Sequence, residues 1–235
     1  MFTNEFVKEK SDHFENLPAQ DLLRWVYKNF KNVGFTSSFS ADDVSIIHMI
    51  KQIKPDALII FIDTDYHFPE TYQLVEKLKK EWDLNLKVIK PLISVEEQNR
   101  LYGEKLYEKD PDKCCEIRKV EPLKRVLNDL DVWITGMRRD QSPTRANIGK
   151  VETHKLPDGK LILKVNPIAD WTRKDVWRYV EKNNLPYNPL YDQSYLSIGC
   201  APCTRPVLEG EDERAGRWAG KGKLECGLHT FTEKE

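Results

Sequence analysis

One short run of residues constrains the fold more than any other part of the sequence. Residues 57–62 read Ala-Leu-Ile-Ile-Phe-Ile, with no polar side chain, and Asp63, Thr64 and Asp65 follow directly. A strand whose successive residues are all apolar is covered on both faces, as in parallel sheets. Parallel strands are joined by crossover connections, usually helices. The run therefore predicts a sheet between two helical layers.

Strand-like and helix-like segments alternate on either side of this run. Their apolar spacing predicts strands at residues 32–37, 86–89, 132–135 and 161–165, and helices at residues 18–30, 44–53, 70–82 and 172–183, with further helical segments around residues 94–130. We predict an α/β fold with a mostly parallel, twisted sheet and helices on both faces. We expect one domain over residues 1–205 and a mobile C-terminal segment over residues 206–235.

The charge balance narrows the function classes. The chain has 235 residues, with 37 Lys and Arg against 38 Asp and Glu. Nucleic-acid binding usually needs a basic excess, so we expect no nucleic-acid partner. No apolar run approaches the ~20 residues of a membrane-spanning helix, and residues 1–11 are too charged for a secretory signal. We therefore expect a cytoplasmic protein with no membrane partner; a homo-oligomer is left open.

The cysteines form two tight pairs and one single residue. Cys114 and Cys115 are adjacent, Cys200 and Cys203 form a C-x-x-C motif, and Cys226 stands alone. Four thiolates suit zinc or an iron–sulfur cluster. Adjacent residues on a helix point ~100° apart, which a bulky cluster accommodates more easily than one small ion. We favour [4Fe–4S] over zinc, although the spacing alone does not settle the metal, and ordinary buried thiols are the plainer interpretation.

Three polar loops should meet where the predicted strands end, at residues 37–43, 63–66 and 136–145. Ligands of open α/β sheets bind beyond the carboxyl ends of the strands. Hydroxyls and backbone N–H groups at a helix N-terminus can hold phosphate, although serines there are also ordinary N-caps. In the third loop Gly136 precedes Arg138, Arg139 and Arg145. Arginine guanidinium groups match phosphate and sulfate oxygens, so this loop predicts an anion site.

The single cysteine lies in the motif Glu-Cys-Gly-Leu-His at residues 225–229. His229 is three residues from Cys226, and Arg214 and Arg217 lie upstream. Cationic neighbours lower the pKa of a thiol and so favour the reactive thiolate. Because the other four cysteines are paired, Cys226 is a candidate nucleophile. A surface cysteine is the plainer interpretation.

Taken together, these motifs resemble the assimilatory sulfonucleotide reductases, the adenylylsulfate and phosphoadenylylsulfate reductase family, in its form that bears an iron–sulfur cluster. The resemblance rests on SSFSADD (residues 37–43), DTDYHFPETY (63–72), CCEIRK (114–119), WITGMRRDQS (133–142), SIGCAPC (197–203) and ECGLH (225–229). Two departures are Asp65, where the family often has glycine, and a short segment between Trp218 and Cys226.

The resemblance implies an adenine nucleotide alpha-hydrolase-like fold. It also implies reduction of adenosine 5′-phosphosulfate to sulfite and AMP, with thioredoxin as electron donor, in sulfate assimilation and cysteine biosynthesis. Cys226 would be the nucleophile and would form an S-sulfocysteine. The implied roles of other residues are cluster ligands for Cys114, Cys115, Cys200 and Cys203; nucleotide contacts for Ser38, Phe39, Ser40, Thr64, Gly136, Arg138 and Arg139; and phosphosulfate contact or assistance to the tail for Lys119, Arg214, Arg217 and His229.

Three alternatives remain at this point. The first is a reductase of the 3′-phosphorylated nucleotide, or an enzyme of dual specificity. The second is an ATP-pyrophosphatase-type ligase or thiolase with structural zinc, which would consume ATP, release pyrophosphate and be colourless. The third is a non-catalytic iron–sulfur sensor that binds nucleotide and produces no sulfite.

Overall fold

The computed structural model describes residues 2–223, 225 and 227–229. Its centre is a six-stranded sheet in the order β3-β2-β1-β4-β6-β5. The strands are β1 (Val33–Thr36), β2 (Leu58–Ile62), β3 (Leu86–Ile89), β4 (Val132–Ile134), β5 (Val151–Lys155) and β6 (Leu161–Val165). All neighbouring strands are parallel except β5 and β6, which are antiparallel. The predicted α/β class and mostly parallel sheet are confirmed.

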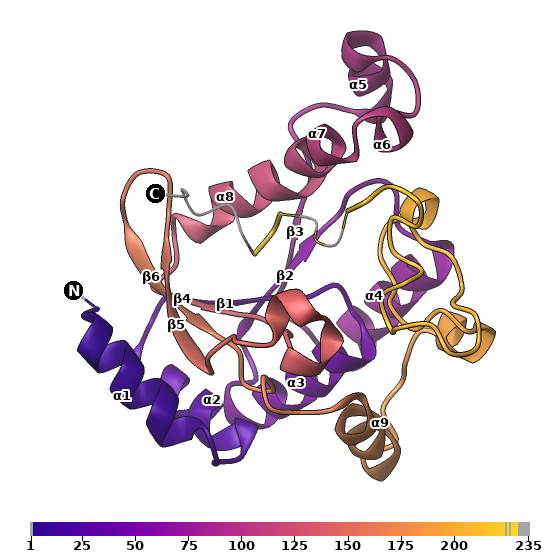
Figure 1. The fold of residues 1–235 in the computed structure, drawn as a ribbon. Coiled ribbons are helices and arrows are strands. Elements are labelled where there is room, and N and C mark those ends of the chain that lie inside the picture. The colour runs from indigo at the N-terminus through magenta and orange to yellow at the C-terminus, as the bar shows by residue number, and fades with distance from the viewer. Residues whose placement is uncertain (1, 224, 226, 230–235) are drawn as a thin grey trace.

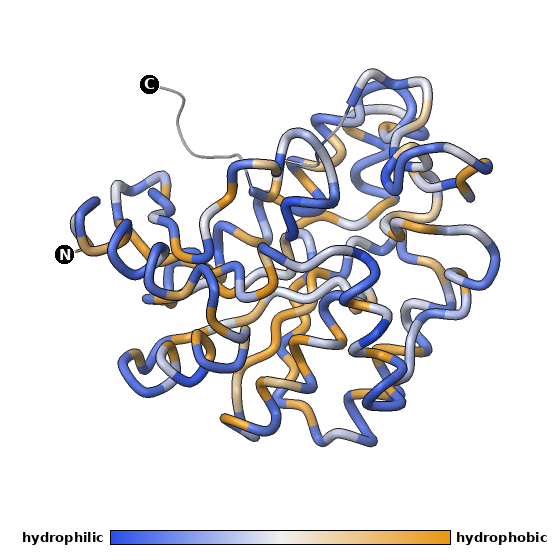
Figure 2. Tube along the Cα trace, turned by 60° about the horizontal axis from the view of Figure 1, so that its bottom comes forward, coloured by the Kyte–Doolittle hydropathy of each residue, from blue (hydrophilic) through white to orange (hydrophobic). Residues whose placement is uncertain are grey.

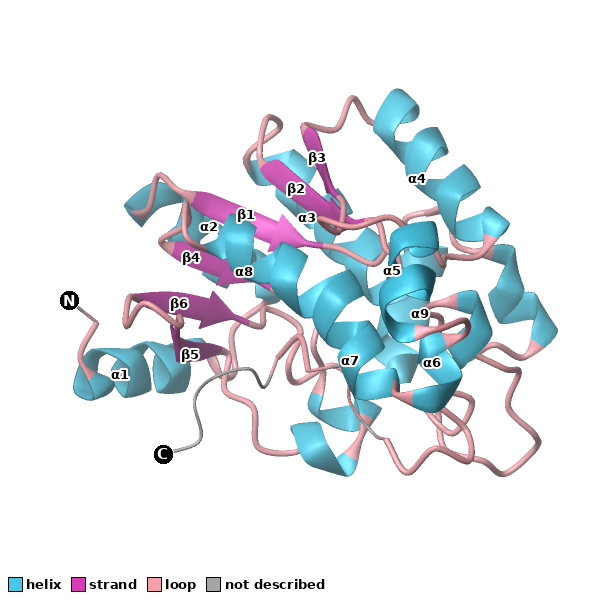
Figure 3. Cartoon of the chain, turned by 90° about the horizontal axis from the view of Figure 1, so that it is seen from above, coloured by secondary structure: helices cyan, strands magenta, loops and turns pink. Residues whose placement is uncertain are grey.

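Helices cover both faces of the sheet, as Figure 1 shows. One face shares a core with α2 (Ala19–Asn29), α3 (Ala41–Ile53), α4 (Pro69–Glu81) and α9 (Arg173–Lys182). The other face packs against α8 (Glu121–Leu127). The remaining helices are α1 (Asn4–Phe14), which contacts β5, and α5 (Val95–Tyr102), α6 (Leu106–Lys109) and α7 (Pro111–Cys115). Seen from above in Figure 3, α7 continues the line of α8 past the tips of the strands.

In β1, β2, β4 and β6, alternate residues face different sides of the sheet and pack in different cores. Phe35 and Phe61 belong to the core with α2, α3, α4 and α9, whereas Ile60 and Trp133 belong to the core with α8. Gly34 faces this second core, and a Cβ there would lie 2.8 Å from side-chain carbons of both Ile60 and Leu130. The inner strands β1, β2 and β4 are therefore almost wholly apolar, whereas the edge strands β3 and β5 include polar, less buried residues. Apolar residues gather in the middle of the molecule, and polar residues lie on the outer helices (Figure 2).

Helix caps explain where two of the predicted helices begin. The helix expected from residue 44 starts at Ala41, because the Ser40 side chain accepts a hydrogen bond from the Asp43 backbone N–H. Thr172 and Asp175 form the capping box that starts α9, close to the predicted boundary. Helix α1 and strand β5 were not predicted from the sequence. No helix in the described part of the chain is long and apolar enough to cross a membrane.

Candidate active site

A cavity of about 180 Å³ lies at the carboxyl ends of β1, β2 and β4. Residues at or just after the strand ends, such as Thr36, Thr64 and Thr135, form one side of it, and residues 196–199, 213–214, 217–218 and 228–229 contribute from the C-terminal part. The residues predicted from the sequence that line this cavity are Ser38, Ser40, Thr64, Lys119, Gly136, Arg214, Arg217 and His229.

The serine loop that leads into α3 is shaped by the buried carboxylate of Asp43. The Ser38 N–H and hydroxyl donate to Asp43 Oδ2 at 2.6 and 2.8 Å. Burial raises the pKa of Asp43 to about 7, against the lowering effect of these hydrogen bonds. A Cβ on Gly136 would lie 2.0 Å from Asp43 Oδ1. Only glycine at position 136 leaves the Asp43 carboxylate in contact with Ser38.

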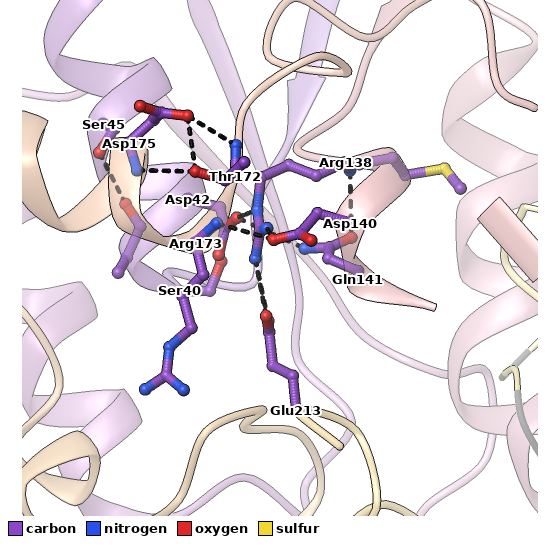
Figure 4. Close-up of polar contacts among 12 residues, drawn as sticks. Ser40, Asp42, Ser45, Arg138, Asp140, Gln141, Thr172, Arg173, Asp175 and Glu213 are labelled. Carbon is purple, nitrogen blue, oxygen red and sulfur yellow. Dashed lines mark hydrogen bonds and ion pairs between the residues drawn. The ribbon is translucent and has the colours of Figure 1, made fainter. Parts of the chain in front are cut away.

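Arg138 is held by three carboxylates instead of facing the cavity. Its guanidinium donates to Asp42, to Asp140 at 3.1 Å and to Glu213 at 2.9 Å (Figure 4). The residue is 1% exposed. Burial alone would lower the pKa of Arg138, but the charges of Asp42 and Glu213 raise it above its ordinary value, so the group stays charged. The pairing also neutralises Asp42, which would otherwise repel an anion in the cavity.

Arg139 and Phe39 also make contacts within the chain where ligand contacts were expected. The Arg139 guanidinium donates to both carboxylate oxygens of Glu15, at 2.5 and 2.8 Å, on the side of α1. The Phe39 ring is buried edge-on against Phe61, with 5.6 Å between ring centroids. Neither residue lines the cavity, and neither does Arg138. Each of these side chains makes structural contacts within the chain, and their expected contacts with a nucleotide stay a prediction.

Four lysine and arginine side chains of the described residues do line the cavity: Lys119, Arg145, Arg214 and Arg217. Arg145 was placed in the anion loop by the sequence but was not singled out as a site residue. Arg217 forms no ion pair with another described residue; its guanidinium lies 4.5 Å from the centroid of the Trp218 ring. A Cβ on Gly199 would lie 2.1 Å from Arg217 Nη2, so this glycine provides the space for the guanidinium.

His229 lines the cavity beside Trp133, an aromatic neighbour that the sequence did not reveal. Its ring stacks on Trp133, with 5.4 Å between centroids and 13° between planes. Burial, together with the nearby charges of Lys164 and Arg145, lowers the pKa of His229 well below its ordinary value. The imidazole is therefore neutral at pH 7, and its Nδ1 is buried with no hydrogen-bond partner among the described residues.

The carboxylate of Glu225 binds two of the cavity cations. Arg145 donates to both Glu225 oxygens at 2.7 Å, and Arg214 donates to one of them at 3.2 Å. Burial opposes ionisation, but these arginines lower the pKa of Glu225 overall. Cys226 lies outside the described residues. The predicted mobility of the C-terminal segment stays a prediction, although Trp218 in that segment is 3% exposed.

The four paired cysteines line a second, enclosed cavity of about 10 Å³ beside the first. Lys119 and Trp218 line both cavities. Burial raises the pKa of Cys114 to about 12, and the charges of the other three cysteines add to this effect. The four cysteines therefore line the same space, and their role as metal ligands stays a prediction. Within the described residues, however, no three Cys, His, Asp or Glu side chains are close enough to hold one metal ion.

A π-helical turn at Glu116–Val120 directly follows the Cys114-Cys115 pair and buries Arg118 and Lys119. Arg118 donates to Gln98 at 2.9 Å and to Asp65 at 3.0 Å. Asp65, which stands where the resembled family often has glycine, has a φ of 59°. Asp is one of the non-glycine residues that tolerate this left-handed region. The loop keeps that conformation, and the Asp65 carboxylate gives Arg118 an ionic partner.

Comparison with known proteins decides the family. The sequence model described as "Phosphoadenosine phosphosulfate reductase domain" matches residues 32–206. The chain belongs to this family. The match of the phosphoadenosine phosphosulfate reductase domain confirms the resemblance to sulfonucleotide reductases. The domain boundary expected at residue 205 stays a prediction.

Relatives of the phosphoadenosine phosphosulfate reductase family cover nearly the whole chain. A protein of Halalkalibacterium halodurans named adenosine 5′-phosphosulfate reductase is 44% identical over 95% of this chain and 96% of its own. A protein of Geobacillus kaustophilus with the same name is 47% identical over 92% and 91%. The crystal structure of a phosphoadenylyl-sulfate reductase from Candida auris, a phosphate complex, has a TM-score of 0.77 and 31% identity, covering 88% of this chain and 98% of that one.

The contact between Gly136 and Asp43 yields a test of the serine loop. We expect Gly136→Ala to push the Asp43 carboxylate away from Ser38 and to weaken AMP binding by about tenfold, the equivalent of about 1.4 kcal/mol. Isothermal titration calorimetry would measure this loss. The control is Gly159→Ala in the β5–β6 turn, where a Cβ meets nothing within 4 Å but the φ of 84° strains an alanine, so it reports backbone destabilisation without a change in the serine loop. An unchanged AMP affinity in Gly136→Ala would contradict a role of this loop in nucleotide binding.

Proposed function

We propose that this protein reduces adenosine 5′-phosphosulfate to sulfite and AMP, with thioredoxin as the electron donor. The observation that supports this most is that the C-terminal part of the chain lies at the cavity beyond the strand ends. Glu225 contacts Arg145 and Arg214, two cations that line the cavity, and Leu228 and His229 line it themselves. These residues flank Cys226 in the sequence. Lys119, Arg145, Arg214 and Arg217 provide the positive charge that a phosphosulfate needs.

In the first step the Cys226 thiolate attacks the sulfur of the sulfonate group. A bond forms between the two sulfur atoms, and the bond from the sulfonate sulfur to the bridging oxygen breaks. AMP leaves with the electron pair of that bond, and Cys226 becomes an S-sulfocysteine. The cavity cations neutralise the phosphosulfate, so that an anionic thiolate can approach it. His229 is neutral and can donate one N–H hydrogen bond.

In the second step a thioredoxin thiolate attacks the Cys226 sulfur of the S-sulfocysteine. Sulfite leaves with the electron pair of the sulfur–sulfur bond, and a mixed disulfide forms between Cys226 and thioredoxin. The second thioredoxin thiol resolves this disulfide and returns Cys226 to the thiol state. The dithiol loses two electrons in total, and the sulfur of the substrate gains them.

We also propose that Cys114, Cys115, Cys200 and Cys203 hold a [4Fe–4S] cluster. The donor set is four thiols around one enclosed space, with no imidazole or carboxylate among the residues that line it. Zinc needs all four sulfurs about 2.3 Å from one point, whereas each iron of the cluster takes its own thiolate. The all-thiol donor set therefore suits a cluster, in which each thiolate has to reach only its own iron. When bound, the cluster would supply negative charge next to Lys119.

Replacement of the proposed nucleophile tests the chemistry. We expect Cys226→Ser to lower sulfite release by roughly a thousandfold or more, because the hydroxyl is a far weaker nucleophile at neutral pH. Sulfite would be measured with thioredoxin and adenosine 5′-phosphosulfate. The substitution changes only one atom of the side chain, so the AMP affinity of the same variant should stay within about twofold of that of the unmodified protein. Normal sulfite release by Cys226→Ser would contradict the assignment.

Replacement of a cluster ligand tests the metal. Protein purified without oxygen should be brown and contain about four iron atoms per chain. We expect Cys114→Ser to lose colour and iron, whereas Cys226→Ser, the matched control, should keep both. Iron content and the visible absorption spectrum are the measurements. A colourless protein with one zinc ion per chain would instead support a structural zinc site.

A reductase of the 3′-phosphorylated nucleotide is the second candidate, because the similar Candida auris structure is named a phosphoadenylyl-sulfate reductase. The more similar bacterial relatives are named adenosine 5′-phosphosulfate reductases. We therefore expect kcat/KM to be at least about tenfold higher for adenosine 5′-phosphosulfate, a difference of about 1.4 kcal/mol. Sulfite release from each nucleotide with thioredoxin would decide. A preference for the 3′-phosphorylated form would reverse the order of the two candidates.

A further inference from the structure

The Glu225 carboxylate occupies a binding arrangement suited to a small anion. Arg145 Nε and Nη2 each donate to a different oxygen of Glu225, both at 2.7 Å. Arg214 donates at 3.2 Å and the Thr144 hydroxyl at 3.1 Å. This planar, two-point contact is how arginine also binds phosphate and sulfate. The chain therefore places one of its own carboxylates where an oxyanion would be held.

The contact is shielded from solvent, unlike most ion pairs of the molecule. The side chains of Arg145, Glu225 and Arg214 are 9%, 16% and 14% exposed. Arg205 and Glu211 also form a two-point contact, through Nη1 and Nη2, but their side chains are 41% and 27% exposed. Shielded charge pairs are screened less by water and salt, so Glu225 competes strongly with any other anion for these arginines.

The cations around the cavity fall into engaged and remaining groups. Arg138 and Arg139 do not line the cavity and are engaged by carboxylates. Arg145 and Arg214 line the cavity and both contact Glu225, which leaves Lys119 and Arg217 as the cations there without a described contact to that carboxylate. A phosphosulfate bears negative charge on two groups, and so it needs more than one cationic partner. Lys119 and Arg217 can meet one of these groups, whereas Arg145 and Arg214 can meet the other only by exchanging Glu225 for the substrate.

We propose that Glu225 is a positioning residue that acts as an internal competitor: its carboxylate holds Arg145 and Arg214 until the anionic group of the nucleotide displaces it. This proposal rests on the proposed function, because it takes the nucleotide to be the competing ligand. Displacement frees the carboxylate of Glu225, which precedes Cys226 in the sequence. Nucleotide binding and loss of the Glu225 contacts with Arg145 and Arg214 are thereby linked, so that each favours the other.

The test compares binding of a charged and an uncharged probe, without turnover. Glu225→Gln keeps the side-chain length but removes the charge. We expect its AMP dissociation constant to fall by about tenfold, since the fraction of molecules with a free anion site rises. Adenosine, which has no phosphate, should bind with unchanged affinity. Glu225→Asp keeps the charge and should bind AMP more nearly as the unmodified protein does. Isothermal titration calorimetry supplies all three measurements.

Glu211→Gln is the matched control, because it removes the same charge from the exposed pair with Arg205 and should leave AMP affinity unchanged. Thermal unfolding would confirm that each variant is folded. Equal or weaker AMP binding by Glu225→Gln, or a parallel gain for adenosine, would overturn the proposal. Sulfite release by the unmodified protein, measured separately, reports on the proposed function. Normal sulfite release without tighter AMP binding in Glu225→Gln would therefore sink this inference alone.

Discussion

The arrangement of the site depends on one buried guanidinium, that of Arg138. Burying an unpaired charge is costly, so its position holds only while carboxylates surround it. Those carboxylates come from three parts of the chain: Asp42 at the start of α3, Asp140 in the anion loop and Glu213 in the C-terminal segment. Asp140 also accepts from the Arg173 N–H at the start of α9. Arg138 thus joins the serine loop to the segment that carries Arg214 and Arg217.

The sequence alone could not predict which cations make structural contacts and which line the cavity. Arg138, Arg139 and Arg145 lie within eight residues, and nothing in the local sequence distinguishes their roles. Only the fold brings Asp42 and Glu213 to the first and Glu15 to the second, each from a distant part of the chain. Arg145 alone of the three lines the cavity. Local spacing predicts that an anion loop exists, but long-range ion pairs decide which of its arginines can contact a ligand in the cavity.

The predictable part of the fold is the part set by local pattern. The apolar run that became β2 and the capping residues of α9 depend on neighbours in sequence, and both were predicted correctly. Strand β5 escaped prediction because its buried residues, Val151 and His154, are three apart, which is not the alternation of a half-buried strand. Helix α1 escaped because its apolar residues are few and find their partners in β5 and α2.

The carboxylates of the site also explain how a cavity rich in cations folds without its ligand. Like charges close together in a poorly hydrated space destabilise a fold, unless opposite charges accompany them. Asp42 and Glu213 both line the cavity, but they share their charge with Arg138, which is 1% exposed and does not line it. Glu225 instead offsets Arg145 and Arg214, and both of these arginines line the cavity. The proposed exchange with a substrate therefore concerns the carboxylate whose cationic partners can themselves reach a ligand.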